Sequence, residues 1–277
     1  MDIHIANDKE YAELRSLWCQ TFGDDADFVD KFYDVLNAVG YVAIDDGHVR
    51  SCLTLFQAGT FNEKTVWVSY AICTEPKYRG NSFASKLTEY VRDIVSKKNG
   101  ISLLCPAELS LIPFYEKTGY KPYFYTKNCF VEVSDDVSVE TSTLNIADYN
   151  KWREEFLMDI SHVAVNERLL AFAKWDSSVL QPMLLVNNGD AICFIESVDD
   201  GVLTASEIIV NPKLLAYSKE ICLQIAQGLA KFFEVDKVVF KTISVSSYVE
   251  NLQGMLADES LEFNDNLTMP YFGFPLK

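Results

Sequence analysis

Hydrophobic and polar positions follow two different periods along this 277-residue chain, and together they predict a mixed α/β (α+β) fold. An apolar residue at every third or fourth position predicts helices at 8–22 and 26–39. Strands are expected at 3–6, 41–44, 49–56, 66–74 and 101–105, with alternation clearest at 66–74, a continuous apolar run at 101–105 and a hairpin turn at Asp46-Gly47. A helix after Gly80, a short helix that ends at Gly119 and strands up to Val133 complete the first half.

The strand at 66–74 is expected to be central, because both of its faces are largely apolar. Strict alternation assigns its residues to two faces, Val66, Val68, Tyr70 and Ile72 on one and Trp67, Ser69, Ala71 and Cys73 on the other. Pro76 ends the strand, Gly80 permits a tight turn, and a helix pattern follows, in which Phe83 and Leu87 are expected to face the core.

This order of strand, turn and helix predicts an anion site. The first amides of a helix have no intrahelical partner, and the positive end of the helix dipole favours negative charge beside them. A phosphate is therefore the expected ligand, with Lys77 and Arg79 close enough in sequence to assist. The amides that would converge on it belong to Asn81, Ser82, Phe83, Ala84 and Ser85.

The segment TEPKYRGNSFA resembles motif A of the GCN5-related N-acetyltransferase (GNAT) superfamily, in which Arg79, Ser82 and Ala84 occupy the motif positions. The resemblance implies acetyl-CoA as co-substrate, with its diphosphate on these amides and on Gly80. It also implies that backbone groups of Ile72, Cys73 and Thr74 pair with pantetheine and hold the thioester carbonyl. One departure is Ser82, where the family usually has glycine, and we expect it to weaken binding slightly.

A second motif, ISLLCPAELSLIPFYEKTGY at 101–120, resembles motif B of the same superfamily. There the strand diverges from its neighbour and opens a slot for pantetheine, and a tyrosine of the following helix stands near the thioester sulfur. Tyr115 matches that tyrosine. A departing thiolate needs a proton, so the resemblance implies Tyr115 as general acid; the alternative is a core tyrosine that packs beside Phe114.

The general base is less clearly indicated. Glu108, just after the strand at 101–105, could deprotonate the attacking amine directly or through a water, or it could be an ordinary solvated carboxylate at a helix start. The apolar end of the chain, 270–277, is expected to be buried, so the terminal carboxylate is another candidate; it reaches the site in the larger Eis-like enzymes whose N-terminal part this chain resembles. A covalent intermediate on Cys73 is a further alternative, but no histidine lies nearby in sequence.

Composition excludes several function classes. A net charge of −16 repels nucleic acid and anionic lipid and attracts cations, so the expected acceptor is a small cationic amine or a lysine-containing peptide. An acidic cluster at Asp24, Asp25, Asp27 and Asp30 could face this acceptor or be a solvated surface. Seven scattered cysteines, three dispersed histidines and no export signal or apolar span predict a soluble cytoplasmic protein that binds no metal.

The second half repeats the order of elements seen in the first half. SDDVSVETST at 134–143 is the expected boundary, which gives a catalytic domain at 1–134 and a GNAT-like domain at 144–277. Aligning Pro212-Lys213 with Pro76-Lys77 leaves no equivalent of Arg79 or Gly80. The second domain is therefore expected to be a degenerate copy that binds no CoA and that completes the acceptor cleft or covers a sheet edge.

These observations predict tandem GNAT-like folds, each with a mixed central sheet flanked by helices, and an N-acetyltransferase that acts by direct attack of an amine. A non-catalytic acyl-CoA sensor or interaction module is the alternative, since Ser82 replaces a glycine and no base is evident. An aminoacyl transferase would need to bind transfer RNA, which the acidic charge opposes. The sequence indicates neither the acceptor nor the oligomeric state.

Overall fold

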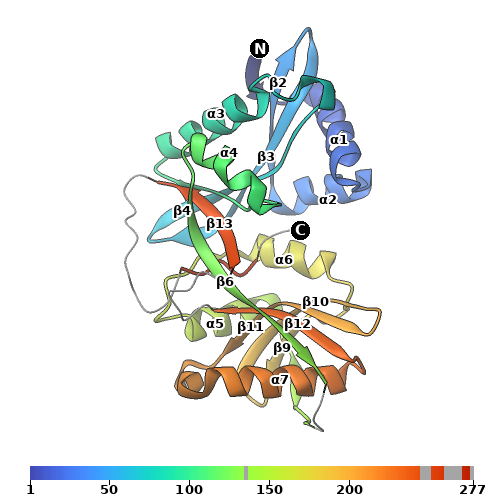
Figure 1. The fold of residues 1–277 in the computed structure, drawn as a ribbon, viewed down its shortest axis with the longest axis vertical. Helices are drawn as coiled ribbons and strands as arrows, with labels where there is room; N and C mark the ends of the chain where they lie inside the picture. Colours follow the sequence, from blue (N-terminus) through green and yellow to red (C-terminus); the bar gives the residue numbers. More distant parts are fainter. Residues whose placement is uncertain (134–136, 244–250, 259–269, 275–277) are drawn as a thin grey trace. The chain divides into compact units, whose positions relative to one another are not determined.

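The protein forms two compact units, each built from two separate segments of the chain. The computed structural model describes residues 1–133, 137–243, 251–258 and 270–274, without the side chains of 215–219. The first unit comprises Met1–Tyr123 and Gly254–Phe263, and the second comprises Phe124–Gln253 and Asn264–Lys277 (Figure 1). The two domains expected from the sequence, 1–134 and 144–277, are continuous stretches. In the structure each unit is discontinuous, because Gly254–Phe263 belongs to the first unit although it follows most of the second unit in sequence.

The first unit is a mixed sheet with helices on both faces. In chain order its elements are β1 (Asp2–Ile5), α1 (Asp8–Phe22), α2 (Ala26–Leu36), β2 (Val39–Asp45), β3 (His48–Phe61), β4 (Lys64–Thr74), the 3-10 turn η1 (Pro76–Tyr78), α3 (Phe83–Lys97), β5 (Ile101–Leu104), η2 (Leu109–Leu111), α4 (Ile112–Lys117), the start of β6 (Lys121–Glu132) and most of β13 (Asn251–Ala257). The strand order is β1-β2-β3-β4-β5-β13. β4 and β5 are parallel, and the other neighbours are antiparallel.

Local signals explain where the first elements begin and end. Asn7 caps α1 and forms a capping box with Glu10, and Gly23 ends the helix in a left-handed conformation. The predicted hairpin at Asp46-Gly47 is confirmed, since both residues have positive φ, 50° and 73°. The predicted helix at 8–22 is confirmed to the residue.

The core of the first unit lies on both faces of the sheet. On one face Trp18 of α1 and Phe32 of α2 pack against Tyr70 of β4, and the rings of Phe32 and Tyr70 stack with centroids 4.9 Å apart. On the other face α3 packs against β2 and β3, through a cluster of Leu87, Val91, Val95, Tyr41, Leu53 and Leu55. β4 lies between β3 and β5, which confirms that it is central.

A β-bulge near the end of β4 corrects the predicted alternation. Two register pairs, Cys52↔Cys73 and Thr54↔Tyr70, show that β4 contains one residue more than β3 over this stretch, and Ala71 takes a left-handed φ of 48°. Tyr70 therefore packs on the α1 and α2 face, whereas Ile72 packs on the α3 face. The prediction that these two side chains share a face is wrong because strict alternation cannot cross a bulge.

The second unit repeats the plan of a sheet flanked by helices (Figure 1). Besides the remainder of β6, its elements are β7 (Thr141–Thr143), α5 (Ile146–Phe156), β8 (Ala164–Val165), α6 (Glu167–Asp176), β9 (Met183–Val186), β10 (Ala191–Asp199), β11 (Val202–Val210), η3 (Pro212–Tyr217), α7 (Ser218–Phe232) and β12 (Lys237–Ile243). The strand order is β6-β12-β11-β10-β9-β7. α7 packs on the strands through Ile225, Ala226, Leu229 and Ala230.

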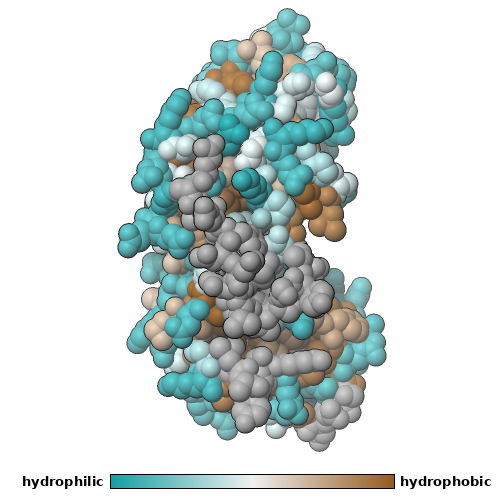
Figure 2. Space-filling model, turned by 60° about the vertical axis from the view of Figure 1, so that its left-hand side comes forward, coloured by the Kyte–Doolittle hydropathy of each residue, from teal (hydrophilic) through white to brown (hydrophobic). Residues whose placement is uncertain are grey.

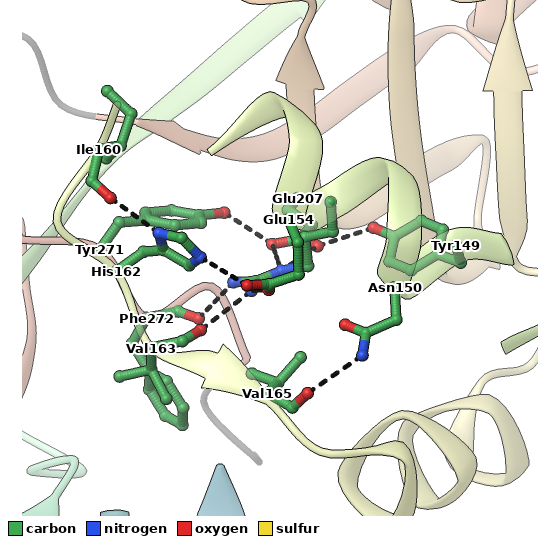
Figure 3. A network of polar contacts seen from close by, with 11 residues as sticks. Tyr149, Asn150, Glu154, Ile160, His162, Val163, Val165, Glu207, Tyr271 and Phe272 are labelled. Carbon is green, nitrogen blue, oxygen red and sulfur yellow. Dashed lines mark hydrogen bonds and ion pairs between the residues drawn. The ribbon is translucent and has the colours of Figure 1, made fainter. Parts of the chain in front are cut away.

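The C-terminal residues 270–274 are held in the second unit by a buried ion pair (Figure 3). Arg153 of α5 and Glu207 of β11 are both fully buried, 3.1 Å apart. The Arg153 guanidinium also donates to the Phe272 carbonyl at 2.9 Å, and the Tyr149 and Tyr271 hydroxyls donate to the Glu207 carboxylate at 2.7 and 2.9 Å. The predicted burial of this segment is confirmed for Tyr271, Phe272 and Phe274; Leu276 and Lys277, with the terminal carboxylate, lie outside the described residues.

The coloured part of the visible face is mostly hydrophilic, and its hydrophobic residues form small separate groups (Figure 2). Such scattered apolar side chains are normal for a protein surface. Over the described residues, every helix is too short or too polar to cross a membrane.

Candidate functional site

The parallel strands β4 and β5 separate near their C-terminal ends and leave an opening in the sheet. Their register pairs run from Val66↔Ile101 to Val68↔Leu103. Beyond that point β5 has only Leu104 left, whereas β4 continues for six residues to Thr74. Among the described residues, no strand pairs with this edge of β4 beyond Val68, so its backbone donors and acceptors could bind a ligand. The resemblance to motif B implied a slot at this place.

Backbone direction decides which of the three predicted β4 residues face this opening. The Glu75 amide donates to the Arg50 carbonyl at 2.9 Å, so Cys73, two residues earlier, also directs its backbone groups toward β3. The Ser51 hydroxyl donates to the Cys73 carbonyl at 2.7 Å and lies 2.9 Å from the Thr74 hydroxyl. Ile72 and Thr74 alternate with Cys73, so their backbone groups point to the edge on the β5 side.

The turn between η1 and α3 exposes the predicted amides. Gly80 and Ser82 both adopt left-handed conformations, with φ of 81° and 61°. Ser82 is the N-cap of α3, yet its side chain makes no capping hydrogen bond. In the described part of the chain, the amides of Asn81, Ser82 and Phe83 donate to no carbonyl, and those of Ala84 and Ser85 lie in the first turn of α3, where helical geometry provides none. The turn therefore presents a row of free donors beside the positive end of the α3 dipole.

Charged side chains surround this turn. Arg79 is exposed, and its Nε donates to the Thr74 carbonyl at 3.3 Å, which places its guanidinium between the end of β4 and the turn. Lys77 pairs with Glu75 at 2.8 Å, and Arg50 of β3 pairs with the same carboxylate at 2.8 Å. The bond to Lys77, followed by that to Arg50, lowers the pKa of Glu75. The loop thus has two exposed cations beside the free amides.

Tyr115 of α4 is buried and available as a donor. Its side chain is 8% exposed and lies edge-on to Phe114, with ring centroids 5.0 Å apart, and to Tyr120. Burial, with a smaller effect of Tyr120 and Cys105, raises its pKa to about 12, so the phenol keeps its proton at neutral pH. The contact with Phe114 is the one that a core tyrosine would make. Packing is therefore compatible with both expected roles of Tyr115, general acid and core residue.

Glu108 lies in the exposed loop after β5. Its carboxylate accepts a hydrogen bond from the Ser110 hydroxyl at 3.0 Å, and the neighbouring Leu109 is 71% exposed. The loop geometry therefore leaves Glu108 hydrated, as a surface carboxylate would be.

Cys73 belongs to a pair of buried thiols on the α1 and α2 face of the sheet. Its sulfur lies 3.2 Å from that of Cys52, and this contact, with burial, raises the pKa of Cys52 well above its ordinary value. The neighbouring thiol is no base, so it offers Cys73 no route to the thiolate that an acyl-enzyme would need.

The acidic cluster of the α1–α2 hairpin mostly serves the fold. Asp24 accepts from the Trp18 indole at 2.6 Å, and Asp25 caps α2 by accepting from the Phe28 amide. Asp30 accepts from the Tyr11 hydroxyl at 2.9 Å and from Arg15 at 2.6 Å. Asp27, in the first turn of α2, is the member to which these contacts give no such role.

Two residues beside the site were not predicted. Ser51 and Arg50 on β3 hold the end of β4 and the turn that follows it, and only strand pairing brings them there from 22 to 25 residues away in sequence. A hairpin prediction that fixed the register of β3 against β4 could have found them. Over the described residues, no group of three or more His, Cys, Asp or Glu side chains could hold a metal ion.

Comparison with known proteins identifies a family model that matches the part of the chain containing this site. Residues 37–122 match the family model of the acetyltransferase (GNAT) domain. The match spans β2 to the start of β6 and so includes the opening, the turn and Tyr115. No curated protein matches the chain.

Solved structures share the fold over most of the chain. A probable N-acyltransferase from Enterococcus faecalis is 12% identical, with a TM-score of 0.67 over 92% of this chain and 72% of that chain. A GCN5-related N-acetyltransferase from Anabaena variabilis is 16% identical, with a TM-score of 0.65 over the same shares. Eis1 from Mycobacterium abscessus is 10% identical, with a TM-score of 0.56 over 87% of this chain and 65% of that chain. At such identities the likeness concerns the fold.

Proposed function

Because the first unit carries a GNAT acetyltransferase domain over residues 37–122, we propose that the protein transfers an acetyl group from acetyl-CoA to a primary amine by direct attack. The observation that supports this most is the end of β4. Its pairing with β5 stops at Val68, six residues before the strand ends. The turn that follows exposes a row of free amides. One strand thus leads from an unpaired edge, suited to pantetheine, to a helix terminus, suited to a diphosphate.

Donor binding is assigned to backbone groups in this proposal. Amides of 81–85 hold the diphosphate, with Gly80 permitting the turn and Arg79 adding positive charge. Backbone groups of Ile72 and Thr74 pair with pantetheine along the open edge and stabilise the oxyanion that forms on the thioester carbonyl. Cys73 contributes indirectly, because its carbonyl bond to Ser51 keeps the end of β4 on β3.

Tyr115 completes the transfer as general acid. When the amine nitrogen bonds to the carbonyl carbon, the carbon–sulfur bond breaks and the thiolate leaves with the electron pair. A phenol that keeps its proton at neutral pH can give that proton, or a strong hydrogen bond, to the thiolate. The amine must also lose a proton, and Glu108, hydrated in its loop, would accept it through water.

The acceptor is proposed to be a small cationic amine or a lysine-containing peptide. A net charge of −16 raises the concentration of cations near the surface. Since most of the hairpin aspartates bind groups of their own unit, this attraction comes from the summed charge more than from a specific acidic pocket.

Acetyl transfer to a panel of polyamines, aminoglycosides and lysine peptides is the direct test. Products should be followed by mass spectrometry, because the free cysteines of the described chain would react with reagents that detect released thiol. Tyr115→Phe should lower turnover about 100-fold or more while the Kd for CoA stays unchanged. Tyr41→Phe, a buried tyrosine of the same unit, is the matched control. Equal turnover in both variants would remove Tyr115 from the mechanism.

A non-catalytic acyl-CoA sensor is the second candidate function. The exposure of Glu108 favours it, since no base is held at the opening by the contacts described above. Stabilisation of the protein by CoA, without any acetylated product across the amine panel, would support the sensor. Absence of stabilisation at millimolar CoA would contradict both functions, since a ligand at 100 times its Kd adds about 2.7 kcal/mol of stability.

A further inference from the structure

Arg50 belongs to β3 and lies beside the end of β4 and the η1 turn. Its side chain contacts Glu75, the residue after β4, and Tyr78 of η1. We propose that Arg50 is a positioning residue for the turn that carries the diphosphate-binding amides, and that it acts through Glu75 and Tyr78 without touching the cofactor. The inference rests on the proposed function, because it concerns the affinity of the same turn for CoA.

The turn has little to hold it in place by itself. Pro76, Lys77 and the residues from Arg79 to Ser82 are exposed, and a methyl group built on Gly80 would meet no atom within 4 Å. Asn81 makes only weak bonds back to the carbonyls of Tyr78 and Arg79, at 3.2 and 3.4 Å. Ser82, a non-glycine residue in the left-handed conformation, adds conformational cost. Ordering from outside the turn is therefore needed for its amides to converge on an anion.

Arg50 supplies one connection through Glu75. Its backbone carbonyl accepts from the Glu75 amide at 2.9 Å, and its guanidinium donates to the Glu75 carboxylate at 2.8 Å. The side chain of Arg50 is only 12% exposed, whereas that of Lys77, the other partner of Glu75, is 65% exposed. The Lys77 bond lowers the pKa of Glu75 more than the Arg50 bond does. Solvent screens the exposed Lys77 pair, however, so we take the less exposed Arg50 as the stronger constraint on the position of Glu75.

The second connection runs through Tyr78 to the helix. The Arg50 guanidinium lies 4.2 Å from the centre of the Tyr78 ring, and that ring is edge-on to Phe83, with centroids 5.9 Å apart. Phe83 is the first residue of α3 and is buried. Two contacts thus lead from Arg50 of β3 through Tyr78 to Phe83 in the helix that presents the amides.

An unpartnered nitrogen supports this reading of the stack. The Arg50 Nε is buried and has no hydrogen-bond partner in the described residues. A guanidinium held over an aromatic face gains cation–π attraction, which compensates in part for the missing acceptor. Tyr78 is therefore what makes this arginine position tolerable, and arginine is what fixes the Tyr78 ring.

Direct charge attraction is the competing explanation, and the two make opposite predictions at Glu75. If Arg50 attracted the diphosphate as a charge, removal of the nearby Glu75 carboxylate would strengthen CoA binding. If Arg50 instead acts through Glu75, removal of the Glu75 carboxylate weakens CoA binding. Salt dependence also distinguishes the two explanations. The effect of an exposed charge on CoA binding fades as the salt concentration rises, whereas the effect of a packed contact persists.

Isothermal titration with CoA on the full chain tests the inference. Arg50→Ala should raise the Kd about tenfold, ~1.4 kcal/mol, and the ratio to wild type should be the same at low and high salt. Glu75→Ala should also raise the Kd. Tyr78→Phe should bind as wild type does, while Tyr78→Ala should match Arg50→Ala. In turnover, KM for acetyl-CoA should rise with kcat largely kept.

Arg15→Ala is the matched control, since Arg15 also pairs with a carboxylate in the first unit, on the α1–α2 hairpin. It removes the same charge and should leave the Kd unchanged. Amide hydrogen exchange without ligand should be faster at 79–85 in Arg50→Ala and unaltered in Arg15→Ala. Arg50→Gln, which keeps most of the side chain, serves if the alanine variant fails to fold.

Three outcomes would overturn the inference. They are tighter binding by Glu75→Ala, a difference between Arg50→Ala and wild type that disappears at high salt, and equal affinities of Arg50→Ala and wild type. Failure of wild-type protein to bind CoA would instead contradict the proposed function, and the inference with it.

Discussion

Ser82 provides the sharpest test of the local geometry at the candidate site. It is the N-cap residue of α3, with φ of 61° and ψ of 18°, a left-handed conformation that favours glycine. A serine normally compensates at this position by capping the helix, but the Ser82 side chain makes no capping bond. Ser82→Gly therefore removes strain and loses no side-chain hydrogen bond among the described residues.

The expected magnitude follows from two opposing effects. Relief of a left-handed non-glycine residue is worth about 1 to 2 kcal/mol, and the greater freedom of glycine in the unfolded chain costs about 0.4 to 1 kcal/mol. A net gain of roughly 0.8 kcal/mol remains, which corresponds to about 2 to 3 °C in Tm for a protein of this size. The missing hydroxyl should also let CoA approach more closely, and we expect about threefold tighter binding.

Ser85→Gly is the matched control, because it makes the same chemical change three residues later. Ser85 lies inside the first turn of α3, where its hydroxyl donates to the Ser82 carbonyl at 3.2 Å. Glycine in a helical position costs roughly 0.5 to 1 kcal/mol. Differential scanning fluorimetry should thus show Tm shifts of opposite sign. Two variants that are destabilised alike would refute the argument that Ser82 is strained.

Three further predictions follow from the described contacts. Ser51→Ala, which leaves the buried Cys73 carbonyl without its hydroxyl partner, should cost about 1 to 3 kcal/mol in urea unfolding. Thr88→Val removes a buried hydroxyl that has no partner among the described residues, so it should be neutral or stabilising, and equal costs of the two variants would contradict the role of the bond. Gly273→Ala should lower the free energy of unfolding by about 3 kcal/mol or more, because at a φ of 89° the new methyl group would meet Arg153 and Glu207, the buried ion pair of Figure 3. The control Gly47→Ala, at a φ of 73° with no atom within 4 Å of the new methyl group, should cost about 1 kcal/mol. Above pH 10 the free energy of unfolding should fall as pH rises, because burial and then the adjacent Glu207 carboxylate raise the pKa of Tyr149 well above its ordinary value, and only the unfolded chain loses that proton. The loss is about 1.4 kcal/mol per pH unit for each such tyrosine, so Tyr149→Phe should reduce the slope of urea midpoints against pH.

Elements with a local signal were predicted closely, and elements that depend on distant pairing were not. α1 was predicted to the residue because Asn7 and Gly23 mark its ends. β3 was expected to end at Phe56, but it continues to Phe61 because β4 pairs with it as far as Lys64. β13 was not predicted at all, since its pairing with β5 joins residues far apart in sequence.

The candidate site divides in the same way. Free amides after Gly80 could be predicted because glycine and a following helix are local signals, and the φ of Gly80 is positive as expected. The bulge could not be predicted, because Ala71 has no residue-type preference for the left-handed conformation that it adopts. Its consequence, the placement of Tyr70 and Ile72 on opposite faces, was therefore missed too.

The second unit shows which part of this geometry can persist without the turn. β11 also contains an extra residue, near Ser206, and its parallel pairing with β12 ends at Ala205↔Phe240, five residues before the strand ends. With Pro212 placed on Pro76, Glu207 takes the position of Ala71, and its buried carboxylate is committed to Arg153. η3 then runs directly into α7, where the first unit has Gly80 and Ser82. A bulged strand that separates from its neighbour is thus a property of the sheet, whereas an anion site also requires the left-handed turn, which explains why we assign CoA binding to the first unit alone.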